Sequence, residues 1–218
     1  MTINVQSLGS NTRSTARIHR AGAAAIAGAV ALAASLIGHG VADYLGTDSM
    51  IDTPGTLAYY LSYGSLSVAW GLLFLGSLGF AAVALRSGRQ LLKDGAALVS
   101  IGLAGTTLGF GFATAAGLAG LGEVALMGDT VAGLSMMFVF TLGSLVAGIA
   151  LLRAEIASRM VAWLMIATGP AMLVGAMVVP AGLDVVLFAG PLCAAWILLG
   201  RELLGANVAI EESAAIPA

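Results

Sequence analysis

Residues 95–122 read GAALVSIGLAGTTLGFGFATAAGLAGLG and contain no charged side chain. A helix rises about 1.5 Å per residue, so about 20 apolar residues cross the roughly 30 Å hydrocarbon core of a bilayer. The run exceeds that length, and it is continuously apolar rather than alternating, which favours a helix over a barrel strand. We therefore predict a transmembrane helix over 95–120.

The rest of the chain has the same character. Of its 218 residues 59% are hydrophobic and only 9% are charged, whereas soluble domains are about a quarter charged. The charge-free stretches are 21–42, 53–85, 95–122, 130–152, 160–183 and 185–200. They predict helices near 21–41, 65–85, 95–120, 131–152, 161–180 and 183–201. The predicted fold class is all-α: a polytopic integral membrane bundle of six transmembrane helices.

The basic residues give the orientation. All nine Lys and Arg residues precede the first predicted helix or follow the second, fourth and sixth, and so fall on one side. The positive-inside rule then places the N-terminus and the C-terminus in the cytoplasm and the protein in the plasma membrane. We expect a cytoplasmic basic segment (1–20), a transmembrane domain (21–204) and a disordered cytoplasmic tail (205–218). A cleaved signal peptide ending near residues 31–33 is the alternative, but the long polar lead favours an uncleaved first helix.

Most remaining charges fit helix ends. A carboxylate favours the N-terminal end of a helix and a cation its C-terminal end. The sequence predicts N-terminal caps at Asp94, Asp129, Asp184 and Ser158. It predicts C-terminal cations at Arg86, Arg153 and Arg201.

The third predicted helix carries small residues at four-residue spacing: Gly105, Gly109, Ala113 and Gly117. Small residues at this spacing let helix backbones approach closely in a membrane. We predict that this face makes close helix–helix contacts and that the third helix is central to the bundle.

Polar and aromatic residues gather near the end of the bundle opposite the basic residues. His39 and Asp43 are at helical spacing, which predicts a hydrogen bond between them at the interface. All four tyrosines lie in the loop over residues 43–64, for which we predict an aromatic belt, with a short interfacial helix at 55–63. The alternative makes the tyrosines, with Asp48 and Asp52, the lid of an outward-facing site.

The last two predicted helices each contain a Gly-Pro pair, Gly169-Pro170 and Gly190-Pro191, about ten residues from the intervening turn. Proline removes a backbone hydrogen bond and frees a carbonyl. Paired breaks at one depth predict a solute cavity or hinge, with Met165, Met172 and Cys193 as adaptable apolar lining. Two ordinary kinks that help the helices pack are the alternative.

No catalytic constellation emerges from the sequence. The two histidines, His19 and His39, lie near opposite faces, and the single cysteine excludes dithiol chemistry. We expect no enzyme activity, no cofactor, no metal site and no nucleic-acid partner. The expected partners are the lipid bilayer, a small neutral or lipophilic solute, and other membrane helices or further copies of the chain. The leading hypothesis is therefore transport or binding of such a solute, and the alternative is a non-catalytic assembly or regulatory subunit that associates through the Gly-rich helix.

Overall fold

A computed structural model describes residues 12–46, 53–178 and 183–214 of the chain. Within these ranges the side chains of 12–15, 43–44, 172–178, 183–188 and 206–214 are outside the description. The elements in chain order are α1 (Thr12–Tyr44), α3 (Leu57–Arg86), α4 (Gln90–Leu118), α5 (Gly122–Leu134), the π-helix η1 (Ser135–Phe140), α6 (Thr141–Ala154), α7 (Arg159–Val178) and α8 (Leu183–Ala214). The fold is all-α, as the sequence predicts.

Four helical segments in the described residues are long and apolar enough to cross a membrane. They are Ala16–Ala42, Leu57–Arg86, Gln90–Leu118 and Gly122–Ala154. The last combines α5, η1 and α6 into one continuous rod. The protein is therefore a multi-pass membrane protein. The crossings by α7 and α8 stay predictions, because that hairpin includes residues outside the description.

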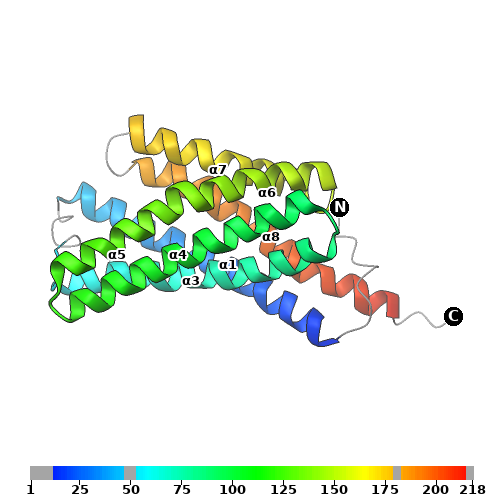
Figure 1. Cartoon of the computed structure of the whole chain (residues 1–218), viewed down its shortest axis with the longest axis horizontal. Coiled ribbons are helices and arrows are strands. Elements are labelled where there is room, and N and C mark those ends of the chain that lie inside the picture. Colours follow the sequence, from blue (N-terminus) through cyan, green and yellow to red (C-terminus); the bar gives the residue numbers. More distant parts are fainter. Residues whose placement is uncertain (1–11, 47–52, 179–182, 215–218) are drawn as a thin grey trace.

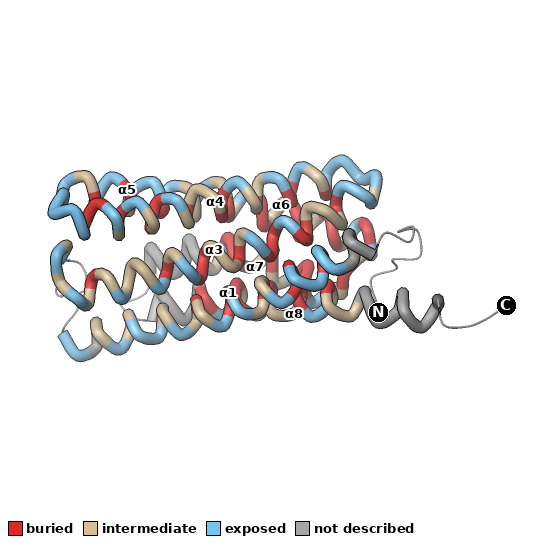
Figure 2. The backbone as a smooth tube through the Cα atoms, turned by 90° about the horizontal axis from the view of Figure 1, so that it is seen from below, coloured by how far each residue is buried: buried red, intermediate tan, exposed pale blue. Residues whose placement is uncertain are grey.

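The helices form an elongated bundle in which each one packs against its neighbours in sequence, and α8 returns to pack against α1 (Figure 1). Buried residues gather where the rods face one another, and the outward faces are exposed (Figure 2). The exposed faces are strongly apolar: Leu57 is 74% exposed and Leu108 is 71% exposed. Lipid, rather than water, suits such a surface.

The side chains divide the bundle into two chemically different ends. At one end Arg89 donates to the carbonyl of Arg153 (3.0 Å) and the backbone N–H of Ser158 donates to Glu202 (3.1 Å). Here α1 begins, α3 gives way to α4, α6 gives way to α7, and α8 ends (Figure 1). We call it the basic end. The opposite end, which holds Tyr59, Tyr60 and Tyr63, is the tyrosine end.

Helix α4 packs on the α5–η1–α6 rod through backbone contact. Gly95, Gly102 and Gly109 are seven residues apart, and a Cβ on them would lie 2.6, 2.5 and 2.5 Å from the backbone nitrogens of Ala147, Phe140 and Ala132. Glycine is required at all three because no real Cβ fits at such distances.

The facing residues on the rod are not evenly spaced. Ala147 and Phe140 are seven residues apart, but Phe140 and Ala132 are eight residues apart, and η1 lies between them. In a regular α-helix eight residues would turn the contact face away by about 80°. The π-helix absorbs the extra residue, so that α5 and α6 both keep their small residues on α4.

Several helix boundaries differ from the sequence predictions. Residues 55–63 do not form a separate interfacial helix, because α3 runs unbroken from Leu57, with the Thr56 hydroxyl accepting from the Tyr59 backbone N–H (3.1 Å). Asp94 and Asp129 are not N-terminal caps but lie within α4 and α5. Asp94 accepts instead from the Gln90 side chain (2.7 Å). The charges mark where the apolar segment ends, and the helices continue beyond it.

Other helix-end predictions are confirmed. Ser158 precedes α7 and its hydroxyl accepts from the Val161 backbone N–H (3.4 Å). Arg86 and Arg153 lie in the last turns of α3 and α6. The prediction for the last helix is wrong: α8 runs to Ala214, beyond the predicted end near residue 201 and into the predicted tail from 205. Arg201 therefore lies within α8 and is not a C-terminal cation. Asp184 lies in the first turn of α8, and its side chain is outside the description.

Candidate functional site: a groove at the basic end

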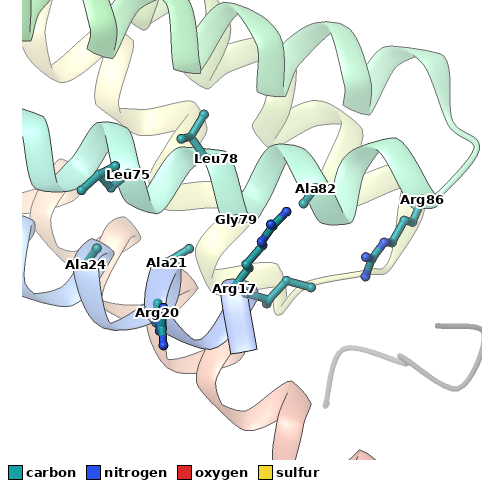
Figure 3. A pocket seen from close by; sticks show the side chains of 10 residues that line it. Arg17, Arg20, Ala21, Ala24, Leu75, Leu78, Gly79, Ala82 and Arg86 are labelled. Carbon is teal, nitrogen blue, oxygen red and sulfur yellow. The ribbon is translucent and has the colours of Figure 1, made fainter. Parts of the chain in front are cut away.

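An open-sided groove of about 480 Å³ lies between α1 and α3 at the basic end (Figure 3). Its volume is in the range of about 300–1,000 Å³ that is usual for small-molecule sites. The α1 residues that line it are Arg17, Ile18, Arg20, Ala21 and Ala24. The α3 residues that line it are Leu75, Leu78, Gly79, Ala82 and Arg86.

Small residues create this groove. Gly79 packs against the Ala21 side chain, so α1 and α3 touch at that level. Ala24 and Ala82 are too short to fill the space beside this contact, and both are only half-buried. Leu75 and Leu78 border the opening and are about half exposed (50% and 47%). The walls are therefore apolar and open towards the lipid phase.

Arginines surround the end of the groove that is nearest to the helix termini. Arg17 and Arg20 are exposed residues near the start of α1, and Arg86 is an exposed residue in the last turn of α3. Arg17 extends from α1 towards α3, and Arg86 extends from α3 towards α1 (Figure 3). None of the ten described residues that line the groove is acidic. An apolar trough thus ends in a concentrated positive charge.

The sequence does not indicate the groove as a site, although its charged residues are visible there. Arg86 is assigned there only to a helix end, and Arg17 and Arg20 only to orientation. The packing of α1 on α3, in which Gly79 lies opposite Ala21, brings these three arginines together. The small residues on both helices were a signal of close packing. The sequence does not show which residues of α1 face which residues of α3.

The Gly-Pro residues lie at several different places. Helices α7 and α8 both continue through their prolines. Pro170 and Gly190 are exposed, whereas Gly169 and Cys193 are buried. A Cβ on Gly169 would lie 2.9 Å from the Thr141 methyl carbon, so this glycine lets α7 approach the end of the π-helix.

The remaining predicted lining residues can be placed in part. Pro191 is half-buried, Met165 is buried, and the side chain of Met172 is outside the description. That the Gly-Pro pairs flank a solute cavity stays a prediction.

The small residues of α4 lie inside the bundle. Gly109 and Ala113 face α5, and a Cβ on Gly128 of α5 would lie 2.7 Å from the Ala113 backbone nitrogen. Gly105 packs against Ser135, and Gly117 packs against the Tyr59 ring. The chain itself thus covers the face that the assembly-subunit hypothesis reserves for a partner.

At the tyrosine end His39 joins α1 to α3. Its Nδ1 lies 3.2 Å from the carbonyl oxygen of Ser35, and its Nε2 lies 2.7 Å from the hydroxyl of Ser62. A carbonyl only accepts, so Nδ1 donates to Ser35, and in the neutral tautomer with its proton on Nδ1 the other nitrogen, Nε2, accepts from Ser62. The predicted hydrogen bond to Asp43 falls on a side chain outside the description. No sequence pattern pairs His39 with Ser62, which lies 23 residues away.

The tyrosines fasten α3 to α4. Tyr59 donates its hydroxyl to the carbonyl of Ala113 (3.3 Å), and Tyr60 donates to the carbonyl of Gly117 (3.0 Å). Both carbonyls belong to the last two turns of α4, so these bonds hold the start of α3 against the end of α4. The lid hypothesis is untested, because Asp48 and Asp52 lie outside the described residues.

Among the described residues no group of three His, Cys, Asp or Glu side chains is placed to hold a metal ion. No protein-family model, curated protein or solved structure matches this chain.

Proposed function

We propose that the protein binds a lipophilic molecule in the plasma membrane and takes it directly from the lipid phase into the groove between α1 and α3. The single observation that carries this proposal is the open-sided apolar groove of about 480 Å³. Such a groove accepts an apolar chain without requiring it to pass through water. In this proposal the basic end faces the cytoplasm, as the positive-inside rule requires.

The packing of the bundle interior supports binding over passage through its centre. Trp70 of α3 and Phe140 of η1 are almost fully buried, and their rings meet edge to face with centroids 5.9 Å apart. Large aromatic side chains thus occupy the space between these two elements. The position of the α4 stripe inside the chain also makes the assembly-subunit hypothesis less favoured.

A photoactivatable diacylglycerol with a diazirine on one acyl chain tests the proposal, because this probe is neutral and lipophilic. After illumination of the protein in bilayers, we expect cross-links within residues 17–24 and 75–86. Ala24→Phe should reduce these cross-links at least fivefold, because the new ring fills the groove.

The matched control is Ala23→Phe, which adds the same ring to the neighbouring, exposed position of α1. It should cross-link like the wild type. Equal cross-linking in the Ala24→Phe and Ala23→Phe proteins would overturn the proposed function.

A further inference from the structure

The proposed function leaves open which lipophilic molecule enters the groove, and the inference drawn here rests on that function. Three arginines lie around an otherwise apolar trough. A neutral molecule would contact only the apolar walls of the trough. An amphipathic anion would use both features.

The depth of the arginines matches the head-group layer of a bilayer. The charge-free stretch of α1 begins at Ala21, one turn after Arg17, and the charge-free stretch of α3 ends at Leu85, directly before Arg86. Both guanidinium groups therefore belong to the boundary between hydrocarbon and water, where lipid phosphates lie. The apolar walls at Gly79 and Ala82 continue from this level into the hydrocarbon region.

The chemistry of the guanidinium group selects a phosphate. Its planar N–H donors match two oxygens of a phosphate at once, and the charge assistance makes these hydrogen bonds strong. Arg17 and Arg86 approach the space from opposite helices, so a phosphate between them is reached from two sides (Figure 3).

Net charge separates the two common kinds of phospholipid. A zwitterionic lipid brings a cationic group beside its phosphate. Three arginines, with no acidic residue among the described residues of the lining, repel that cation. An anionic phospholipid such as phosphatidylglycerol brings no cation. Basic residues near a membrane surface favour such a lipid.

We propose that the groove is a binding site for one anionic phospholipid of the leaflet at the basic end. Its phosphate lies among Arg17, Arg20 and Arg86, and one acyl chain lies in the trough beside Gly79 and Ala82. Basic pockets between transmembrane helices are a recognised means of holding such head groups.

Native mass spectrometry of the purified full-length chain tests this proposal. The probes are phosphatidylglycerol and phosphatidylcholine with identical acyl chains, each added to the delipidated protein in mild detergent. We expect one phosphatidylglycerol per chain, bound at least fivefold more tightly than phosphatidylcholine.

Charge variants assign the preference to the groove. Arg17→Gln combined with Arg20→Gln should reduce the preference for phosphatidylglycerol at least fivefold, and Arg86→Gln should reduce it separately. The matched control combines Lys93→Gln with Arg201→Gln, which removes two charges from the same end but from residues that do not line the groove. The control should keep the wild-type preference. All these variants must show wild-type thermal unfolding.

The remaining outcomes contradict the anionic-lipid site, or both that site and the lipophilic site. Equal affinity for the two lipids, or an equal loss of preference in the control, overturns the anionic-lipid site. If Ala24→Phe still blocks the diacylglycerol cross-links in that case, the proposed lipophilic site stands alone. A lipid-free dimer whose cysteines introduced at Ala24 cross-link to each other would show that a second copy fills the groove and would overturn both.

Discussion

Gly22 of α1 and Gly200 of α8 lie against each other's carbonyl oxygen. A Cβ on Gly22 would be 2.8 Å from the oxygen of Gly200, and a Cβ on Gly200 would be 2.7 Å from the oxygen of Gly22. This reciprocal contact joins the first helix to the last, within the first half of α1 and the middle of α8. Helix α1, which supplies one wall of the groove, thus also packs against α8.

Gly200→Ala tests this contact. The added methyl group overlaps the backbone of α1, and overpacking of this kind costs about 1–3 kcal/mol. We expect a lower free energy of unfolding, measured by denaturant titration in mixed micelles. Gly205→Ala is the control on the same helix, because no atom lies within 4 Å of a Cβ there. It should be neutral or slightly stabilising, since alanine favours helix by up to about 1 kcal/mol. Similar losses in both variants would remove the special role of Gly200.

Gly109→Leu should destabilise the bundle far more than Leu108→Ala. The leucine at Gly109 would enter the backbone of α5 at Ala132, whereas Leu108 is 71% exposed. Folded yield and thermal unfolding in detergent measure the difference. A Gly109→Leu protein that unfolds like the wild type would mean that α4 and α5 do not pack as closely as described.

The sequence predicts the α4 contact face well, because a four-residue spacing of small residues has one dominant meaning in a membrane helix. It does not predict the π-helix, because one extra residue in an apolar run changes neither composition nor charge. The ends of helices are also poorly predicted. Asp94 and Asp129 mark the edge of the apolar segment, but backbone hydrogen bonding continues the helix beyond that edge.

The candidate site was hidden for a different reason. Its residues come from two helices about 60 positions apart, and only the packing of Gly79 on Ala21 sets which side chains meet. The same applies to His39, whose hydroxyl partner Ser62 comes from another helix. Long-range register is an energetic outcome of many small contacts, and a single sequence does not display it.

The π-helix makes a prediction about deletions. Removing the exposed residue Phe138 should convert η1 into regular α-helix and leave the contact faces of α5 and α6 on α4. Thr141 marks the π-helical register, because its hydroxyl donates to the carbonyl of Met136, five residues earlier (3.1 Å). The deletion variant should stay folded, as judged by a monodisperse detergent complex. Deleting the exposed residue Leu126, within α5, should prevent folding. The deletion turns the residues of α5 that precede it by about 100° relative to the residues that follow. Equal outcomes would contradict the register argument.

Cys193 tests the predicted cavity at the Gly-Pro pairs. Its side chain is buried, and a packed thiol should react with maleimide only after unfolding. If the Gly-Pro pairs flank a cavity instead, maleimide should label Cys193 in the folded protein. Pro170→Ala and Pro191→Ala should then impair solute binding non-additively, because both would shape one site. An unreactive thiol together with additive losses of stability would end the cavity hypothesis.

The orientation of the bundle can be tested with single cysteines in a Cys193→Ala background. Glu123 is exposed at the tyrosine end, and Gln90 is exposed at the basic end. In intact cells an impermeant thiol reagent should label a cysteine at Glu123 and not one at Gln90, because the positive-inside rule keeps the basic end in the cytoplasm. Permeabilised cells provide the control, in which both should react. The reverse pattern would place the arginine-lined groove in the outer leaflet, and its phospholipid would then have to come from there.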